Sequence, residues 1–448
     1  MPASPWLNDM KLEQTEVDRD ELAAFIDTHW CSEHWPGRTL SAAGLSFIPL
    51  GEDSHCYELR PDTGEPLAFF ARLEPARNGS AELDAVAERL ETAARVCAVL
   101  ATQPTRLAAA VVAPLRTAAV GGEHPRFVAQ LPPFAIVLFE KVEGQQVMPP
   151  DDDGSWVAAT ADRTAAAALV GLLHGSCKRG VVGESDTDLA LDSAVAALGE
   201  EDFSHRHAAG IKVALTRAKT EPDSIVPEIE RETCALLRES EPGITWLLTE
   251  LERLRLKFVS EAQGGDLGFV LTHQEPHLAN FCAAEGTPPS GTRQLRLVDW
   301  GDIKWGPPER DLFALLGDAR PPGIRKAVLD AYLFARFESR PAGAEPAATV
   351  RPEMLRWYEL RWVAQEIDDY ASRILNADHT LGGGLAARDT HTDLTTRAQE
   401  QERCLVELKD YLPVNIDGLR CSICGVEAEA IAAAWVGTAA VKEEDALR

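Results

Sequence analysis

The sequence predicts an α+β fold, with a small β-rich N-terminal part and a larger, mainly helical C-terminal part. Short alternating runs separated by turn residues fill residues 45–75, a pattern typical of a β-meander. After residue 156, long segments carry apolar residues at the three- and four-residue spacing of helices. At 448 residues, the chain exceeds one ordinary core and suits two lobes with appendages.

The pattern predicts elements and domains in a definite order. We expect a helical extension (1–39), a β-rich N-lobe (40–145), a C-lobe (146–412) and a C-terminal extension (413–448). The expected strands are 45–53, 55–60, 67–75, 108–115, 126–131, 134–144, 264–272 and 294–300. The expected helices are 17–30, 80–101, 159–177, 225–262, 326–337, 357–375 and 397–412.

Composition excludes several classes of protein. Hydrophobic residues make up 45% and charged residues 26%, which is typical of a globular chain. No window approaches eighteen apolar residues, so we expect no membrane span. The first residues lack a basic region followed by an apolar one, so we expect no secretory signal. Nine scattered cysteines fit reduced thiols and a cytoplasmic location.

The formal net charge of −27 argues against nucleic acid as a partner, because a phosphate backbone needs a basic surface. An acidic cleft that attracts a cationic small molecule is one interpretation of this charge. An acidic surface that only keeps the protein soluble is the alternative. The oligomeric state is left open.

The residues with the clearest chemical pattern lie between residues 271 and 316. This stretch contains His273, Glu275 and Asn280, and a short strand that ends at Asp299 follows. Phosphoryl transfer needs a carboxylate that deprotonates the acceptor hydroxyl. It also needs an amide oxygen and a second carboxylate to hold Mg²⁺ against the phosphates. Glu275, Asn280 and Asp299 are the right chemical types in the right order.

This motif resembles that of the aminoglycoside phosphotransferase family, whose usual form is HGDxHxxN followed by a strand and an IDW or VDW triplet. The sequence PPERDL at 307–312 is most similar to the spectinomycin-phosphotransferase branch. The resemblance implies a bilobal protein-kinase-like fold and transfer of a phosphoryl group from ATP or GTP. It implies Glu275 as the catalytic base and Asn280 and Asp299 as Mg²⁺ ligands.

The resemblance also assigns the N-terminal meander to a lobe that covers the nucleotide. The loop with Gly51, Asp53 and Ser54 would then lie over the phosphates. The third strand places Arg72 where kinase-like folds usually have a lysine that holds phosphates. Arginine can also hold phosphate, through a longer and forked group. The alternative is that Arg72 faces solvent and another cation holds the phosphates.

Two further nucleotide contacts are expected from the resemblance. Glu88, on the helix after the third strand, is our candidate for the carboxylate that pairs with Arg72, with Glu82 and Glu91 as alternatives. The backbone from Glu140 to Val142, where the lobes connect, would receive the adenine edge.

Two departures from the family pattern leave a second function open. Glu275 stands where aspartate is most common, and Gln274 stands where glycine is usual, although glycine often marks a positive φ. The alternative is therefore a pseudokinase that binds nucleotide or ligand and transfers nothing. A scaffold whose acidic surface binds a partner is a third class.

Other candidates have plain structural interpretations. His273 and His277 are expected to brace the loop by hydrogen bonds, and His174 is expected to be a packed helix-end residue. The helix at 357–375 could face the acceptor with Tyr358, Trp362, Asp368 and Asp369, or pack in the core. A zinc site from His29, Cys31, His34, Cys421 and Cys424 is the one metal alternative.

The function predicted from the sequence is an Mg²⁺-dependent kinase that phosphorylates a hydroxyl of a small molecule. An aminoglycoside or aminocyclitol antibiotic is the family's best-known acceptor, and relatives also phosphorylate choline-like molecules and sugar alcohols. The resemblance implies that the segment between residues 183 and 262 lines the acceptor site. This segment is therefore expected to determine which acceptor binds.

Overall fold

A computed structural model provides the structure of the protein. It describes residues 17–48, 54–60, 69–76, 79–103, 107–118, 125–142, 145–147, 156–176, 191, 193–220, 227–265, 267–283, 294–316, 322–338, 350–375 and 394–416. The helices are α1 (Arg19–Ile26), α2 (Ser32–His34), α3 (Ser80–Thr102), α4 (Trp156–Ser176), α6 (His207–Thr220), α7 (Glu228–Gly264), α8 (Glu309–Leu316), α9 (Pro322–Glu338), α10 (Pro352–Leu375) and α11 (Leu394–Tyr411). The strands are β1 (Leu45–Ile48), β2 (His55–Leu59), β3 (Phe69–Pro75), β4 (Val128–Leu131), β5 (Phe134–Glu140), β6 (Gln145–Gln146), β7 (Val270–Thr272), β8 (Phe281–Ala283), β9 (Leu295–Leu297) and β10 (Lys304–Gly306).

The chain divides into two compact units, each built from several segments. The first unit comprises Met1–Glu200, Phe269–Gly306 and Asp330–Glu345. The second unit comprises Glu201–Gly268, Pro307–Leu329 and Pro346–Arg448. The predicted α+β organisation is confirmed, because a five-stranded antiparallel sheet comes first and a largely helical region follows.

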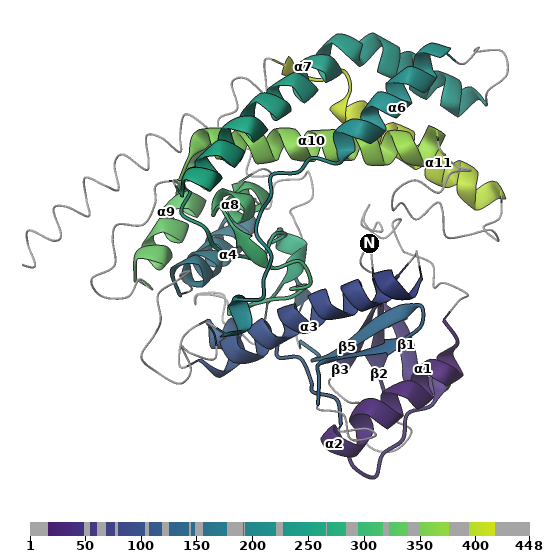
Figure 1. The fold of residues 1–448 in the computed structure, drawn as a ribbon, viewed down its shortest axis with the longest axis vertical. Helices are drawn as coiled ribbons and strands as arrows, with labels where there is room; N and C mark the ends of the chain where they lie inside the picture. The colour runs from purple at the N-terminus through teal and green to yellow at the C-terminus, as the bar shows by residue number, and fades with distance from the viewer. Residues whose placement is uncertain are drawn as a thin grey trace, which may run out of the picture. The chain divides into compact units, whose positions relative to one another are not determined.

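The large sheet of the first unit has the strand order β1-β2-β3-β5-β4, and every neighbouring pair is antiparallel. Helices cover both of its faces (Figure 1). On one face, Leu22 and Ile26 of α1 pack against Tyr57 of β2. On the other face, Leu83 and Leu90 of α3 pack against the sheet. The meander predicted for residues 45–75 supplies strands β1, β2 and β3 of this sheet.

Strand β5 explains the continuous apolar run in the sequence. Ile136 and Leu138 face the α1 side, whereas Ala135 and Val137 face the α3 side. Because side chains alternate along a strand, a strand covered on both faces needs apolar residues at every position. The same alternation on β3 places Arg72 on the α3 side, since it pairs with Val137 in the register.

The prediction of a strand at residues 108–115 is wrong. The segment starts as a short 3₁₀ turn, Ala108–Ala110, and continues with isolated bridges at Val111 and Pro114. Proline lacks the N–H that a ladder needs, so Pro114 interrupts regular pairing. The segment lies beside β5, where Leu115 donates a backbone hydrogen bond to Leu138.

The predicted helix at residues 17–30 is present but changes its character along its length. Asp18 caps α1, because its carboxylate accepts hydrogen bonds from the backbone N–H groups of Asp20 and Glu21. After Ile26 the chain continues as one π-helical turn, Asp27–Cys31. Burial of the Cys31 thiol raises its pKa, which keeps it protonated and unreactive.

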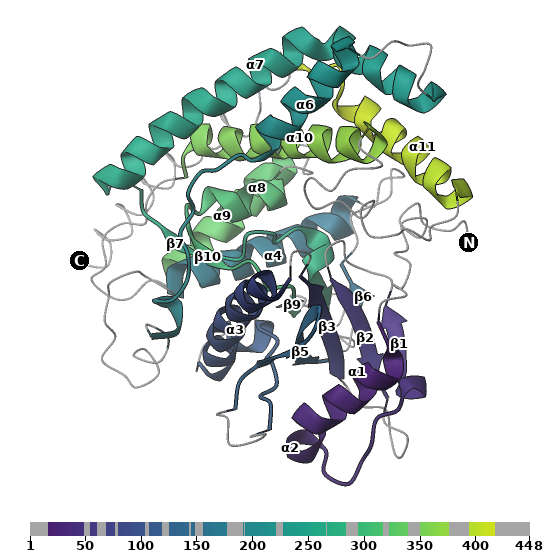
Figure 2. The ribbon, with the colours of Figure 1, turned by 45° about the vertical axis from the view of Figure 1, so that its right-hand side comes forward.

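The second unit is helical, and α6, α7, α10 and α11 form its body (Figure 2). Helix α10 packs against each of the other three and also against α8. Trp357 and Tyr358 of α10 are buried, so Tyr358 has the core role that the sequence left open. Trp362 is 40% exposed and lies between the rings of Phe313 and Tyr411.

Candidate active site

Two small β ladders of the first unit hold the residues that carry the predicted chemistry. In one ladder, Thr272 at the end of β7 pairs with Lys304 at the start of β10. In the other, Phe281 at the start of β8 pairs with Leu297 at the end of β9. The loops 273–280 and 298–303 therefore leave and enter the same two ladders. Asn280 and Asp299, which are far apart in the sequence, therefore lie at the same end of the β8–β9 ladder.

Hydrogen bonds join these two loops directly. The backbone N–H of Val298 donates to the carbonyl of Asn280 over 2.9 Å. The buried His273 ring donates from Nε2 to the carbonyl of Val298, also over 2.9 Å. The rings of His273 and Trp300 pack in a T-shaped arrangement, with their centroids 4.9 Å apart. His273 therefore braces the loops, as its position in the sequence predicts.

Gln274 has a backbone φ of +83°, in the region that glycine adopts most easily. The positive φ explains why the family usually has glycine at this position. In this chain a glutamine adopts the same φ, at a cost in backbone strain. The Gln274 side chain is buried and donates to the hydroxyl of Thr272, which itself donates to the carbonyl of Lys304. These contacts hold the loop in place at the residue with the strained backbone.

Glu275 is exposed and Asn280 is buried, and the two are linked through the backbone. The amide nitrogen of Asn280 donates to the carbonyl of Glu275 over 2.8 Å and lies 3.2 Å from Nε2 of His277. A carbonyl can only accept, so this contact settles which end of the amide is the nitrogen. Among the described residues, these hydrogen bonds use Nδ2 of Asn280 and do not use its Oδ1.

Asp299 sits two residues beyond the end of β9, with a φ of +64°. Aspartate tolerates this left-handed conformation better than most residues. Asp299 accepts a hydrogen bond from Nη1 of Arg72, and the two form an ion pair. Burial raises the pKa of Asp299, but the charge and hydrogen bond of Arg72 outweigh it, so the pKa lies below its ordinary value.

The side chains present fit a magnesium ion. Mg²⁺ takes oxygen ligands and keeps several waters when few protein groups bind it. Oδ1 of Asn280 and the carboxylate of Asp299 would supply two such oxygens from the same end of the β8–β9 ladder. The guanidinium of Arg72 lies against Asp299, so a cation already occupies the neighbourhood where the metal would bind.

The expected pairing of Arg72 with Glu88 is not what the structure has. The exposed Glu88 carboxylate contacts Arg126 at 3.2 Å. Arg72 contacts Asp299 and, at 3.6 Å, Glu74 on its own strand. The buried carboxylate of α3 is Glu91, which accepts hydrogen bonds from the backbone N–H groups of residues 127 and 128. Glu91 therefore ties α3 to the start of β4.

The remaining predicted nucleotide contacts lie in or beside the large sheet. Ser54 is buried and precedes β2, with its hydroxyl 3.9 Å from the sulfur of Cys56. Gly51 and Asp53 lie outside the described residues. Glu140 ends β5 and is exposed, and Val142 lies two residues beyond it. Their roles in nucleotide binding stay predictions.

Sequence reasoning missed two charged residues beside this site, Glu74 and Arg89. Arg89 of α3 contacts Glu74 of β3, the carbonyl of Gly301 at 2.8 Å and the carboxylate of Asp302 at 2.7 Å. A signal for one of them was available, because strand alternation puts Arg72 and Glu74 on the same face of β3. No local pattern points to Arg89, whose contacts join segments more than two hundred positions apart.

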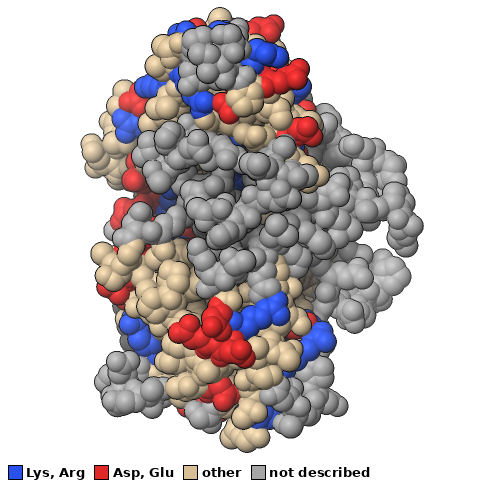
Figure 3. Space-filling view, turned by 90° about the vertical axis from the view of Figure 1, so that its right-hand side faces the viewer, with Lys and Arg blue, Asp and Glu red and all other residues tan. Residues whose placement is uncertain are grey.

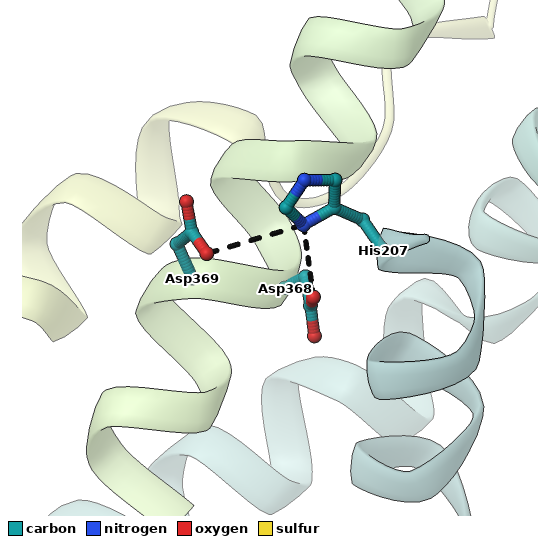
Figure 4. Close-up of side chains that lie close together, drawn as sticks. All are labelled: His207, Asp368 and Asp369. Atoms are coloured by element: carbon teal, nitrogen blue, oxygen red, sulfur yellow. Dashed lines mark hydrogen bonds and ion pairs between the residues drawn. The ribbon is translucent and has the colours of Figure 1, made fainter. Parts of the chain in front are cut away.

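A second group of polar side chains lies within the second unit (Figure 4). Nδ1 of His207 on α6 lies 3.0 Å from Asp368 and 4.0 Å from Asp369, both on α10. The hydroxyl of Ser372 donates to the other oxygen of Asp368 over 3.2 Å. The close approach of α6 at Gly210 leaves no room for a side chain beside Asp368. These contacts join α6 to α10, and a role of Asp368 and Asp369 toward the acceptor stays a prediction.

The alternative zinc site gains no support from the half that the structure describes. His29 contacts the carbonyl of Phe25, and His34 contacts the carbonyl of Arg116. Cys421 and Cys424 lie outside the described residues. His174, as expected, is a buried helix-end residue, and its Nδ1 lies 2.9 Å from the hydroxyl of Tyr332.

Two further observations concern membrane-spanning helices and surface charge. Within the part of the chain that the structure describes, no helix combines the length and apolar character that crossing a bilayer requires. The formal net charge of −27 sums groups of both signs, and Figure 3 shows acidic side chains beside basic ones on one face.

Comparisons with known proteins agree with this fold. A solved structure of spectinomycin phosphotransferase APH(9)-Ia with ADP and spectinomycin matches with a TM-score of 0.55 and 12% identity, covering 88% of this chain and 95% of that one. Its AMP-bound complex matches with a TM-score of 0.50 and 12% identity, covering 92% and 97%. The protein StrN of Streptomyces griseus is 26% identical over 375 residues, which are 81% of this chain and 89% of that protein.

The chain also matches a protein family as a whole. The family described as the phosphotransferase enzyme family matches residues 45–346, which include the large sheet and both loops of the candidate site. The resemblance read from the loop motifs is thereby confirmed, and so is the kinase-like fold of aminoglycoside phosphotransferase structures. This chain belongs to the phosphotransferase enzyme family.

Proposed function

We propose that this protein transfers the terminal phosphoryl group of ATP or GTP to a hydroxyl group of a small molecule. The observation that carries the proposal is the register of β8 and β9, which brings Asn280 and Asp299 to one end of a ladder. Glu275 follows the braced His273 in the adjoining loop. The three side chains are the base and the two metal ligands that this reaction needs.

In this proposal each residue has one task. Glu275 takes the proton of the acceptor hydroxyl while the hydroxyl oxygen forms a bond to the terminal phosphorus. The bond from that phosphorus to the bridging oxygen breaks, and the nucleoside diphosphate leaves with the electron pair. Asn280 and Asp299 would hold Mg²⁺, which neutralises phosphate charge when bound. Arg72 would leave Asp299 and hold phosphate oxygens, a contact for which a guanidinium is suited.

We infer an amine-bearing, cationic acceptor as the substrate class, with an aminoglycoside or aminocyclitol antibiotic as the first candidate. Two observations support this inference. The net charge is strongly negative, which favours encounters with cations. The matched spectinomycin phosphotransferase is described with ADP and spectinomycin bound.

A pseudokinase is the second candidate, and one observation favours it. Arg72 contacts Oδ1 of Asp299, one of the two oxygens of the carboxylate proposed to bind the metal. If that ion pair persisted in the presence of nucleotide and Mg²⁺, the protein would bind ligand without transfer.

The test is a transfer assay with ATP and GTP labelled at the terminal phosphate. The acceptor panel contains aminoglycosides, aminocyclitols, choline-like amino alcohols and sugar alcohols. We expect transfer to an amine-bearing acceptor, with Glu275→Gln lowering turnover by about 10²–10⁴-fold while Mg-nucleotide binding persists. Glu239→Gln, an exposed glutamate of α7, is the matched control and should leave turnover unchanged.

Each other outcome has a definite meaning. Nucleotide binding without transfer to any acceptor would support the pseudokinase. Full activity of the Glu275→Gln variant would remove Glu275 from the role of base.

A further inference from the structure

An ion pair between a strand and a helix of the first unit has its charges in the opposite order to the one we expected from the sequence. We expected a basic residue on β3 and an acidic residue on α3. The structure pairs an acidic residue on β3, Glu74, with a basic residue on α3, Arg89. Glu74 is largely buried, with a side-chain exposure of 12%, so its charge needs a compensating partner.

Arg89 does more than neutralise Glu74. Its Nη2 contacts Glu74, while its Nη1 donates to the carbonyl of Gly301 and the carboxylate of Asp302. One planar, permanently charged group therefore joins β3, α3 and the loop 298–303. An isolated surface ion pair would contribute little, but a fork that also holds a backbone carbonyl fixes geometry.

The segment that Arg89 holds begins with the proposed metal ligand. Asp299 has its left-handed backbone two residues before Gly301. Gly301 is buried, and a Cβ atom added to it would lie 3.2 Å from Nη2 of Arg72. Arginines from two elements thus approach the same short loop, Arg72 at Asp299 and Arg89 at Gly301 and Asp302.

These two contacts respond differently to a bound metal-nucleotide complex. Arg72 contacts Oδ1 of Asp299, so it competes with a metal for that carboxylate oxygen. Arg89 contacts only the carbonyl of Gly301 and the carboxylate of Asp302 in this loop, so its contacts can remain. The loop then needs Arg89 to keep Asp299 in place.

We propose that Arg89, held by Glu74, is a positioning residue that fixes the Asp299 loop for metal binding. This inference rests on the proposed function, because it assumes that Asp299 binds the metal of a nucleotide complex. It also assigns the reversed strand–helix pair a purpose: the helix supplies a cation to the loop and leaves Arg72 for the phosphates.

The experiment measures Mn²⁺ binding to the full-length protein at saturating ADP by electron paramagnetic resonance, so it does not depend on transfer. For Arg89→Gln, we expect Mn²⁺ to bind about 10-fold or more weakly, as is typical when a residue that orients a ligand is lost. Arg89→Lys should recover part of the affinity, because it keeps the charge without the fork. ADP affinity measured without metal should change by less than about 2-fold, since Arg89 itself contacts none of the residues proposed to bind nucleotide.

Arg95→Gln is the matched control. Arg95 lies on the same helix and pairs with Glu91 at 3.0 Å, away from the loop. The Mn²⁺ affinity of the Arg95→Gln variant should stay within about 2-fold of that of the unmodified protein, because no metal-orienting contact is lost. Equal loss of Mn²⁺ affinity in Arg89→Gln and Arg95→Gln would overturn the proposal, as would an unchanged affinity in Arg89→Gln.

The double variant Glu74→Arg/Arg89→Glu separates loop positioning from simple pairing. It restores opposite charges between strand and helix but directs a carboxylate at the carbonyl of Gly301 and at Asp302. We expect Mn²⁺ binding to stay weak, and recovery would refute the loop-positioning role.

The unmodified protein distinguishes failure of this inference from failure of the proposed function. If it binds Mn²⁺ with ADP but transfers nothing, the transferase proposal fails and the variants still decide the role of Arg89. If it binds no Mn²⁺ with ADP, both proposals are wrong.

Discussion

Replacement of Arg72 by methionine should destabilise the protein and expose how strongly Asp299 depends on this partner. Methionine keeps most of the buried stem and removes the charge. Breaking a buried ion pair costs about 3–5 kcal/mol, whereas exposed pairs contribute about 0.2–1 kcal/mol. The side chain of Arg72 is 11% exposed and that of Asp299 is 40% exposed, so water can partly solvate the carboxylate left behind. We therefore expect a loss of about 2 kcal/mol in the free energy of unfolding at pH 7.

The pH dependence of this loss follows from the pKa of Asp299. Its pKa is lowered in the folded protein, so the pair contributes its full stability above the ordinary aspartate pKa of about 3.9. The contribution disappears as the pH falls through the lowered folded-state value. The difference between Arg72→Met and the unmodified protein should thus be constant from about pH 7 to 5 and shrink below about pH 4.

Urea denaturation followed by fluorescence and circular dichroism measures this difference. Arg60→Met is the control, because Arg60 is 56% exposed and pairs with Glu58 at 3.0 Å. It should lose no more than about 1 kcal/mol. The reasoning is refuted if Arg72→Met loses no more than this control, or if its deficit stays undiminished below about pH 4.

Three further predictions address the loop and the second unit. Gln274→Gly should be about 1 kcal/mol more stable than Gln274→Ala in urea denaturation, because both lose the side-chain hydrogen bond and only glycine relieves the positive φ; the reverse order would contradict the strain argument. Glu275→Asp should keep transfer but lower kcat by up to about 10²-fold, because the arm shortens by about 1.5 Å, and a rise in kcat would refute the fit of glutamate to this loop. Hydrogen bonds from Arg255, and then from His205, lower the pKa of Glu252 to about 2, so stability is lost as the pH falls from about 4.3 to 2. Glu252→Gln should flatten that part of the acid-unfolding curve by less than about 1 kcal/mol, since Glu252 is 44% exposed, and an unchanged curve would contradict the assignment.

Local pattern was enough to predict most elements of the fold. The meander that became β1, β2 and β3, the helix α3 and the doubly covered strand β5 all follow from periodicity and turn residues. The failed strand at residues 108–115 has equally apolar residues, but Pro114 and the flanking 3₁₀ turn prevent a regular ladder. Apolar runs alone therefore do not distinguish a strand from an extended segment beside one.

The candidate site was predictable where its residues are close in sequence or fixed by a motif. Chemical type and spacing selected Glu275, Asn280 and Asp299, and the register of β8 and β9 gave two of them a common end. The partner of Arg72 was not predictable in this way. Several carboxylates of α3 were candidates, but Arg72 contacts Asp299 and Glu74 instead. The choice of partner depends on how β3 packs against the loop 298–303, a long-range property that periodicity does not contain.

The charges around the loop 298–303 carry a last consequence for nucleotide binding. Three carboxylates, of Glu74, Asp299 and Asp302, meet two guanidiniums, of Arg72 and Arg89, so this network has a net charge of −1. A nucleoside triphosphate carries several negative charges of its own, and like charges at short range repel. A divalent cation bound between them would reverse the local balance and compete with Arg72 for Asp299. We therefore expect ATP to bind at least about 10-fold more tightly with Mg²⁺ than with EDTA, by isothermal titration calorimetry. Equal affinity in both conditions would mean that the phosphates do not approach this loop.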